Sequence, residues 1–445
     1  MTSTESLQMY EFDTAANLQK AAETHRRGEA RINVVGPEGP VPDAKVQVNL
    51  TRHAFAFGSN AFGWAKMGNL DPQNPKVPIH KTLGDDHHVI ESQLTDRVIA
   101  HGADYDDGTH PHDRLYTHYF TDLYNLAVVP FYELAVSPKA WQSRLHRAGM
   151  LIDWAHRHGM QAKGHPLIFH QKQWDMDWWN QLDREQYWQA MKWRQSKIMG
   201  RFCDSVDYWD FINEPISHTP PYESVLDAAI RSYELTRSLN PHPNLTLNFN
   251  QVEAMNPEYR PQALELVEQL LERGMRPDII GIQSHLGILR EDDIEKVTTT
   301  IDAFARYGIP LHFTETTFRT FGRLPEEERE PRQAHDAEAF YRYIFSRPEI
   351  HALIWWDLCD RHCFCEVGGL LRTDMTPKPA FHALRHLIRE QWHTRTTLTI
   401  EQGTGQFTGY YGTYEAQIEL PDGSSVFDTF ELTRQPNNPI TLTIN

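Results

Sequence analysis

Eight short apolar runs alternate along the chain with longer segments whose apolar residues recur at helical spacing. Two of these segments, AGMLIDWAHRHGM and PQALELVEQLLERGM, end in Gly-Met, and glycine is common just past a helix C-terminus. Strands that alternate with helices predict βαβ units, and eight units predict a closed (β/α)8 TIM barrel, an α/β fold, over residues 55–392. The eight runs are FAFGS, LAVVPFY, QAKGHPLIF, VDYWDFIN, NLTLNF, DIIGIQSH, PLHFTE and HALIWWD.

The two chain ends lie outside this pattern. Residues 30–50, ARINVVGPEGPVPDAKVQVNL, read as two alternating strands around a Gly/Pro turn, and strand–turn–strand patterns return after residue 396. Neither end carries enough strands for an independently stable sheet. We predict that residues 1–54 and 393–445 join in one small accessory β-sandwich beside the barrel. Two separate β-extensions are the alternative.

Composition narrows the class of partner and the compartment. Lys and Arg number 43 against 60 Asp and Glu, and the formal charge of −17 argues against nucleic acid or an anionic membrane as the main partner. The sequence has no run of about 18 apolar residues, so no membrane span is expected. The N-terminal residues lack a basic segment followed by an apolar core, as a signal peptide would have. We expect a cytoplasmic protein, or a secreted one if a leader has been removed.

Two segments invite comparison with metal sites. Residues 64–112 follow the first run, where a barrel has a loop at its active face, and they are rich in Asp, Gly, Pro and His. Residues 359–366, CDRHCFCE, follow the eighth run. Neither segment has the ligand spacing of a zinc site, so we favour a solvated or lid-like loop and structural thiols, with no metal and no cofactor. The residues concerned are His80, His87, His88, His101, His110, His112, Cys359, His362, Cys363 and Cys365.

The fourth apolar run ends in an amide and a carboxylate. Residues 208–216 read YWDFINEPI and include Asn213 and Glu214, and the seventh run ends at Glu315 in HFTET. Side chains at the C-terminal ends of barrel strands face one pocket, so we expect the two glutamates to meet there. Two carboxylates across a pocket indicate cleavage of a glycosidic bond, with one group protonated and the other ionised. The alternative is a pair of ordinary strand-end glutamates that bind Arg or Lys.

Five short segments occur together in one order: GHPLIFH (164–170), WDFINEP (209–215), GIQSHL (281–286), HFTET (312–316) and WWDLCD (355–360). With them the chain resembles glycoside hydrolase family 10, the family of the endo-β-1,4-xylanases, over residues 55–392. The resemblance implies a retaining β-glycoside hydrolase that cleaves xylan-type or related plant β-glycans by double displacement. Its partner would be a β-linked oligo- or polysaccharide.

The resemblance also implies roles for individual residues. Glu214 matches the catalytic acid/base and Glu315 the nucleophile, while Asn213 and His165 match residues that bind the sugar at the cleavage point. His285 matches the residue that hydrogen-bonds the nucleophile. An imidazole or amide that favours ionised Glu315 would keep it nucleophilic, and an apolar wall beside Glu214 would raise its pKa. One of the two tryptophans is expected to pack in the core and the other to line the pocket. The expected substrate-binding residues are His165, Asn213, Gln283, His285, Trp355, Trp356, Tyr132 and His170.

The resemblance breaks down after the second run. The family carries a Glu-Asn pair and then Lys-Trp there, which grip the sugar one site beyond the cleavage point. This chain has Phe131 and Tyr132, then Ala135 and Val136. We expect weak activity on linear xylan and better activity on short or decorated β-glycosides. The alternatives are a glycosidase or transglycosylase of altered specificity, or an inactive carbohydrate-binding protein, against which the retained carboxylate pair argues. Two expected pocket tryptophans are also replaced, by Phe169 and Phe364.

Overall fold

The chain divides into two compact units. The first comprises Met1–Tyr10, Phe57–Ala337 and Ala352–His382, and the second comprises Glu11–Ala56, Glu338–His351 and Ala383–Asn445. The computed structural model describes residues 9–65, 110–137, 139–170, 177–220, 223–241, 244–253, 256, 258–320, 324–365, 367–420, 422–435 and 439–444.

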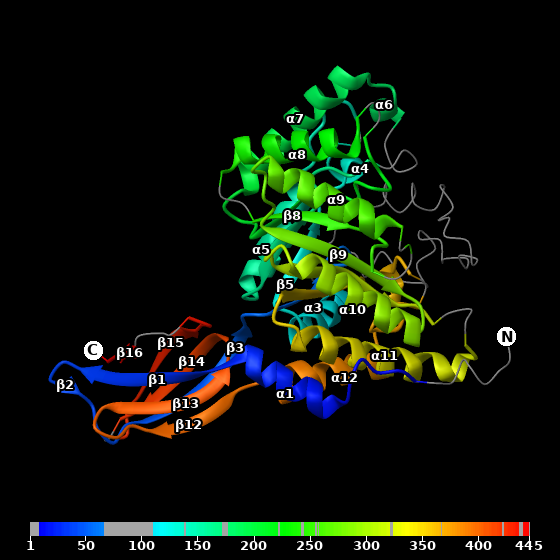
Figure 1. Ribbon diagram of the computed structural model, residues 1–445. Coiled ribbons are helices and arrows are strands. Elements are labelled where there is room, and N and C mark those ends of the chain that lie inside the picture. The colour runs from blue at the N-terminus through cyan, green and yellow to red at the C-terminus, as the bar shows by residue number, and fades with distance from the viewer. Residues whose placement is uncertain are drawn as a thin grey trace. The chain divides into compact units, whose positions relative to one another are not determined.

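A closed barrel forms the centre of the first unit (Figure 1). Each predicted apolar run overlaps one barrel strand, and the pairings from β4 round to β10 are parallel, so the (β/α)8 barrel is confirmed. The strands follow one another around the barrel in chain order, and β11 closes back onto β4. They are β4 (Ala56–Asn60), β5 (Leu126–Pro130), β6 (Gln161–His165), β7 (Tyr208–Asn213), β8 (Asn244–Phe249), β9 (Ile279–Leu286), β10 (Leu311–Phe318) and β11 (Ile350–Trp355).

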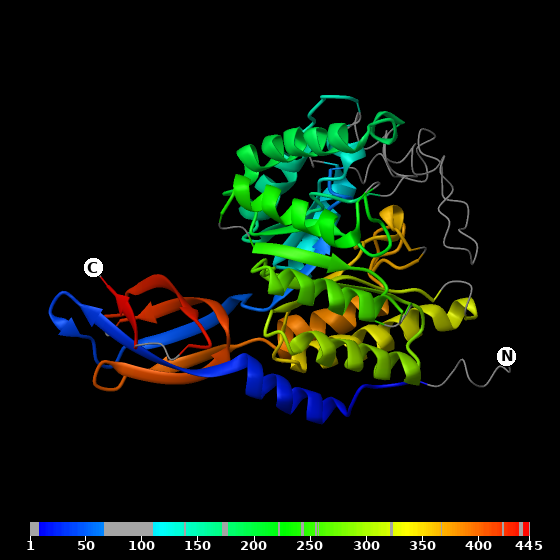
Figure 2. The same ribbon diagram turned by 45° about the horizontal axis from the view of Figure 1, so that its top comes forward.

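Helices connect the strands and cover the outside of the barrel, as Figure 2 shows. Both Gly-Met signals end a helix: Gly159 and Gly274 take the left-handed φ of +70° and +73° that glycine adopts without strain. A capping box of Asp183 and Gln186 starts α7. The helices are α3 (Pro111–Leu123), α4 (Glu133–Val136), α5 (His146–Arg157), α6 (Asp177–Asn180), α7 (Arg184–Phe202), α8 (Val225–Leu239), α9 (Tyr259–Glu272), α10 (Glu291–Ala305), α11 (Glu326–Ser346) and α12 (Pro379–His386), with the short turns η2 (Asp360–His362) and η3 (Leu387–Gln391).

The barrel strands are buried on both faces, because helices cover one face and side chains fill the interior. All eight residues of β10 are buried, for example. Long apolar strands therefore need no polar alternation, which is why the runs read as continuous. Within the described residues, the helices lack the combination of length and hydropathy that a membrane crossing requires.

The second unit contains two four-stranded sheets, and each sheet includes strands from both chain ends (Figure 1). In one sheet β1 pairs antiparallel with β13 and parallel with β16, and β2 pairs with β1. In the other, β3 pairs antiparallel with β12 and β14, and β14 pairs with β15. The description of this region as a β-sandwich stays a prediction. Its strands are β1 (Arg27–Gly36), β2 (Gly39–Pro40), β3 (Lys45–His53), β12 (Arg395–Thr399), β13 (Thr404–Tyr410), β14 (Gly412–Glu419), β15 (Ser425–Leu432) and β16 (Ile440–Thr443).

Helix α1 (Ala15–Arg26) ends in a buried guanidinium within the same unit. Arg26 donates hydrogen bonds to the backbone carbonyls of Phe345 (2.9 Å), Ile350 (2.7 Å) and Arg347. These carbonyls lie at the C-terminal end of α11 and just beyond it, where a helix leaves acceptors unpaired and favours positive charge. Arg26 therefore satisfies the end of a helix that lies more than 300 residues further along the chain.

Candidate active site

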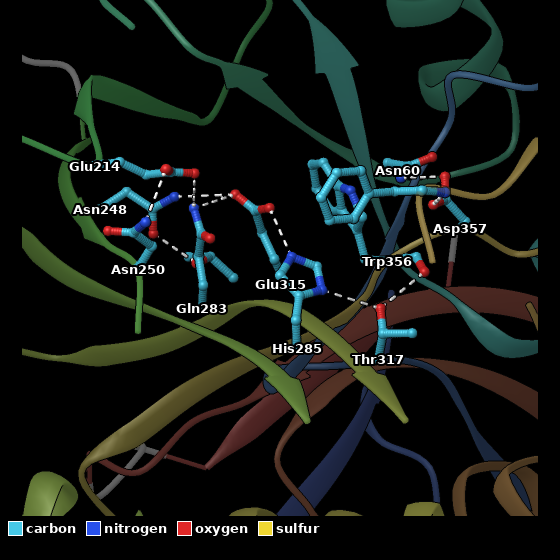
Figure 3. A network of polar contacts seen from close by, with 12 residues as sticks. Asn60, Glu214, Asn248, Asn250, Gln283, His285, Glu315, Thr317, Trp356 and Asp357 are labelled. Carbon is cyan, nitrogen blue, oxygen red and sulfur yellow. Dashed lines mark hydrogen bonds and ion pairs between the residues drawn. The ribbon is translucent and has the colours of Figure 1, made fainter. Parts of the chain in front are cut away.

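The two predicted catalytic carboxylates come from β7 and β10, which β8 and β9 separate in the barrel (Figure 3). Glu214 directly follows β7, and Glu315 lies in the second half of β10. The β10–β9 register shifts between Phe313 and Glu315. Such a bulge changes the alternation of side chains, and here the consecutive residues Thr314 and Glu315 both contact Asn248.

One amide nitrogen bridges the two carboxylates. Gln283 Nε2 donates to Glu214 Oε1 at 2.9 Å and to Glu315 Oε1 at 2.8 Å (Figure 3). These two oxygens can therefore lie no further apart than 5.7 Å, the sum of the two distances. Gln283 comes from β9 and is almost fully buried. Barrel closure thus joins carboxylates that lie about 100 residues apart in the sequence.

Glu315 is surrounded by polar side chains from β8, β9 and β6. Asn248 Nδ2 approaches its Oε1 at 3.3 Å, and His285 Nε2 lies 3.2 Å from its Oε2. His165 Nε2 lies 3.6 Å from Oε1. Only 5 % of Glu315 is exposed, so these contacts take the place of water around the carboxyl group.

The orientation of Asn248 is fixed by its own neighbours. Thr314 Oγ1 donates to Asn248 Oδ1 at 2.6 Å, which turns the amide nitrogen toward Asn213 Oδ1 at 2.7 Å and toward Glu315. A side chain at Gly281 would put a Cβ 2.4 Å from Asn248 Oδ1. Gly281, the first residue of the GIQSHL segment, therefore makes the space in which Asn248 reaches the site.

Glu214 has a strained backbone and its own set of donors. Its φ is +52°, unusual for a residue with a side chain, and its N–H donates to the carbonyl of Asn248 at 2.8 Å. Asn250 Nδ2 donates to Glu214 Oε2 at 2.9 Å, and His218 Nδ1 lies 3.0 Å from the same oxygen. Sequence reasoning missed both Asn250 and His218. Their positions in the sequence could have indicated them, because Asn250 and His218 each follow closely after the C-terminal end of a barrel strand.

The pKa values of the pair are shifted opposite to the expectation. Burial is the main cause that raises the pKa of Glu315 to about 8, although the charge of His165 acts against it and that of Glu214 adds to it. Burial also raises the pKa of Glu214, but His218 and the amide of Gln283 outweigh it and leave this pKa below its ordinary value. We expected an apolar wall at Glu214, and the structure has hydrogen-bond donors there instead.

A buried relay orients His165. Its Nδ1 lies 2.7 Å from Asp210 Oδ2, and Lys163 donates to the other oxygen of Asp210. Burial raises the pKa of Asp210, but Lys163 and His165 lower it more, so it stays ionised. The Tyr132 hydroxyl lies 2.9 Å from His165 Nε2. Both ring nitrogens of His165 thus have polar partners. Tyr132 contacts the site through its hydroxyl group, which lies next to His165.

Aromatic rings line the site beside these polar groups. Trp356 lies next to His165 (ring centroids 5.2 Å) and Phe62 (5.3 Å), and Phe62 lies 6.1 Å from Tyr132. Tyr132 in turn lies 6.0 Å from Phe169. Phe62, which sequence reasoning also missed, closes this row. The part of the site beside His165 is therefore bordered by a row of aromatic rings.

The loop that carries Trp356 is held from the first barrel strand. Asn60 Nδ2 donates to Asp357 Oδ1 at 2.8 Å (Figure 3). The N–H of Phe364 donates to Asp357 Oδ2. Asp357 itself has a left-handed φ of +72°. The Phe364 ring then lies 5.3 Å from that of His285. Asp357 therefore links the aromatic border to the carboxylate cluster.

Trp355 and His170, two of the expected substrate-binding residues, and Phe131 of the altered segment have other surroundings. Trp355 has no exposed surface, and its indole donates to the carbonyl of Gly368 at 3.2 Å, so it packs in the core and Trp356 alone of the pair borders the site. Phe131 is also fully buried, with its ring 5.1 Å from that of Trp209, so it packs in the core and offers no apolar surface to the site. The ring of His170 lies 6.0 Å from that of Tyr187 of α7.

The thiols and histidines weighed as metal ligands have other surroundings. Among the described residues no group of three or more His, Cys, Asp or Glu is arranged to hold a metal ion. Burial raises the pKa of Cys359 to about 12, and its sulfur lies 3.4 Å from that of Met375. His112 contacts Arg361. The histidines at positions 80, 87, 88 and 101 lie outside the described residues, as does most of the predicted 64–112 loop.

The sequence around this site matches the model of one protein family. The family model described as Glycosyl hydrolase family 10 covers residues 133–387, which is more than half of the chain. The chain belongs to glycosyl hydrolase family 10. That range includes Glu214, Glu315, Gln283 and His285 and ends at the first residue of η3, just after α12.

Individual relatives are distant. The anti-sigma-I factor RsgI6 of Acetivibrio thermocellus is 24% identical over 424 residues, which cover 92% of this chain and 47% of that protein. Endo-1,4-beta-xylanase 2 of Arabidopsis thaliana is 23% identical, with coverage of 67% and 27%. The chain thus spans half or less of the length of these two relatives. Xylanase 10B from Thermotoga petrophila, solved in complex with xylobiose, matches the fold with a TM-score of 0.57 at 18% identity, over 69% of this chain and 99% of that one.

Proposed function

We propose that this family 10 member is a retaining β-glycoside hydrolase, with Glu315 as nucleophile and Glu214 as acid/base. The observation that carries the proposal is the amide bridge of Gln283, which limits the nearest carboxylate oxygens to 5.7 Å. Retaining enzymes hold their two carboxyl groups about 5–5.5 Å apart, whereas inverting enzymes leave about 6.5–9.5 Å for a water molecule. A carboxylate separation of no more than 5.7 Å leaves too little room for an attacking water, so it favours direct attack of a carboxylate on the sugar.

The reaction has two displacements. In the first, a Glu315 oxygen bonds to the anomeric carbon while the glycosidic C–O bond breaks and Glu214 gives its proton to the leaving oxygen. In the second, Glu214 takes a proton from water, the water oxygen bonds to the same carbon and the Glu315 ester bond breaks. The product keeps the β configuration, and both carboxyl groups return to their starting states.

The neighbours of the pair fit these steps. Gln283, Asn248 and His285 hold Glu315 in one orientation, so little reorganisation is needed at the moment of attack. Positive charge that develops at the anomeric carbon favours ionised Glu315 and opposes its raised pKa. This developing charge therefore favours the arrangement in which the single proton of the pair lies on Glu214.

We propose a xylan-type or related β-linked oligosaccharide as substrate, preferably a short or decorated one. Relatives named as endo-1,4-beta-xylanases support the sugar class. The row of Trp356, Phe62, Tyr132 and Phe169 supports the preference, because rings can stack on a sugar face but read its hydroxyls poorly. The Tyr132 hydroxyl is already engaged with His165, so it offers little to a second glycone sugar.

The test is the stereochemistry of the first product. Proton NMR during early hydrolysis of an aryl β-xyloside should show the β-anomer before mutarotation, and an α-anomer would overturn the assignment. Glu315→Gln should abolish turnover, which separates an enzyme from an inactive carbohydrate-binding protein. The matched control is Glu268→Gln, an exposed glutamate of α9 paired with Arg306, which should leave turnover unchanged.

The division of roles has its own test. Glu214→Ala should keep activity on aryl glycosides whose leaving group needs no proton, and azide should restore part of the remainder as a β-glycosyl azide. If azide instead rescues Glu315→Ala with that product, the two roles are reversed. Comparison of kcat/KM on linear xylohexaose and on decorated oligosaccharides tests the substrate preference, and linear xylohexaose as the best substrate would refute it.

A further inference from the structure

His218 lies four residues after Glu214 and contacts its carboxyl group directly. His218 Nδ1 is 3.0 Å from Glu214 Oε2 and 2.8 Å from Ser217 Oγ. The backbone N–H of His218 also donates to the carbonyl of Glu214 at 2.9 Å, which fixes the turn between them. On its other side the imidazole packs against Phe169, with ring centroids 5.3 Å apart. The ring is thus held in place and presents one nitrogen to the carboxyl group.

A chain of hydrogen bonds assigns a proton to that nitrogen. Asn250 donates its Nδ2 to Glu214, so its Oδ1 is left as an acceptor, and Ser217 Oγ donates to it at 3.0 Å. The Ser217 oxygen has then used its only proton and must accept from His218 Nδ1. His218 therefore carries a proton on Nδ1, between Ser217 Oγ and Glu214 Oε2. Glu214 receives N–H groups from His218, Asn250 and Gln283, the arrangement that an ionised carboxylate needs.

The nucleophile has the opposite arrangement. Thr317 Oγ1 donates to the carbonyl of Trp356 at 3.3 Å and so accepts from His285 Nδ1 at 3.2 Å. In neutral His285 the other nitrogen, Nε2, is then an acceptor, and it faces Glu315 Oε2. This contact is satisfied when one proton lies between Glu315 and His285. Hydrogen-bond directions thus favour a proton on the Glu315 side of the site and none on Glu214.

We propose that His218 is a positioning residue that, as its Nδ1–H form in the Asn250–Ser217–His218 chain, holds Glu214 ionised in the free enzyme. This inference rests on the proposed function, in which Glu214 must carry a proton to act as acid. The productive arrangement is then a minor population of the free enzyme, and substrate binding has to select it. The lowered pKa of Glu214 agrees with this geometry. The titratable and charged groups that face the pair are His218, His165, Asp210, Lys163, His285 and Tyr132.

Three substitutions separate the proton on Nδ1 from the bulk of the ring. His218→Asn puts an amide nitrogen close to the position of Nδ1 and should keep the donor to Glu214. His218→Gln puts its nitrogen near Nε2 instead, and His218→Phe keeps the ring against Phe169 without any donor. The first variant should keep the contact to Glu214, and the other two should lose it. Ser217→Ala tests the hydrogen-bond chain one residue further from Glu214. It removes the Ser217 hydroxyl, so that the Nδ1–H of His218 has only the Glu214 carboxyl group as acceptor.

The kinetic readout is the ratio of kcat/KM for two aryl β-xylosides, phenyl and 2,4-dinitrophenyl. Only the phenyl compound needs acid assistance. His218→Phe and His218→Gln should raise the phenyl to dinitrophenyl ratio by about three- to tenfold and move the acid limb of the pH profile up by about one pH unit. His218→Asn should leave both unchanged. Equal losses on both substrates with an unmoved acid limb would assign His218 a structural role only and overturn the proposal.

A second readout needs no activity. The carbon-13 shift of the Glu214 carboxyl is followed against pH in a Glu315→Gln background, which removes the coupling to the second carboxyl group, and its signal is identified by loss in Glu214→Gln. His218→Phe should raise the midpoint by about one pH unit relative to the same background with His218. An unchanged midpoint refutes the inference even if hydrolysis is seen. A raised midpoint without turnover of any β-glycoside supports it while refuting the proposed function.

Discussion

Asp210→Asn should destabilise the barrel strongly, because it leaves a buried cation without its partner. Lys163 and Asp210 are 1 % and 0 % exposed, and Asp210 bridges Lys163 and His165. Removal of one member of a buried ion pair costs roughly 3–5 kcal/mol. In a unit of this size that corresponds to a fall in Tm of roughly 5–10 °C. Differential scanning calorimetry of the full chain measures it.

The matched control is the double variant Lys163→Met with Asp210→Asn. It removes both charges while the new amide oxygen can still accept from His165 Nδ1, so it should be more stable than Asp210→Asn alone by at least about 2 kcal/mol. Because the pKa of Asp210 is lowered, its contribution is complete above the ordinary carboxyl pKa and is lost as pH falls further. The difference between natural protein and variant should therefore shrink below about pH 4. A double variant as unstable as the sum of the two single ones would refute the coupling.

Three further perturbations follow from single features. The pH dependence of kcat/KM for the free enzyme should be bell-shaped, because activity needs one proton on the Glu214–Glu315 pair. The acid limb should lie below about pH 4.3 and the alkaline limb near pH 8. An alkaline fall in kcat/KM that begins near pH 6 would contradict the raised pKa of Glu315. Gly281→Ala should push Asn248 from its place and lower kcat roughly tenfold to hundredfold at saturating substrate, and unchanged kcat would show that the site tolerates the 2.4 Å clash. Arg26→Met should cost roughly 3 kcal/mol in thermal unfolding through three unpaired carbonyls, whereas near-natural stability would mean that water replaces the guanidinium.

The sequence predicted the barrel because the strand–helix alternation is a local property. Each apolar run had the length and composition of a strand buried on both faces, and no contact between distant residues was needed to recognise it. The same reasoning put Glu214 and Glu315 at C-terminal strand ends, where any barrel of this kind gathers its functional groups. What the local pattern could not supply was the direction of each side chain.

The structure alone supplies this direction at two pairs of neighbouring residues. Trp355 and Trp356 are alike in sequence, yet Trp355 turns into the core and Trp356 borders the site. Phe131 packs beneath the site while Tyr132 reaches His165. Adjacent residues of a strand end point to opposite sides, so an error of one residue exchanges a core side chain for a pocket side chain. The residue type alone does not tell the two apart, since aromatic rings suit both places.

Sequence by itself determined the strands, the two helices whose C-termini precede Gly159 and Gly274, and the pair of carboxylates that the barrel would bring together. Only the tertiary structure decided the directions in which the pKa values of those two carboxyl groups are shifted. The pKa of Glu315 depends on its depth in the barrel, and that of Glu214 depends on His218 and on the amide of Gln283 from β9. Burial and hydrogen-bond direction are properties of the closed barrel, where strands far apart in the chain converge, and no stretch of sequence contains them.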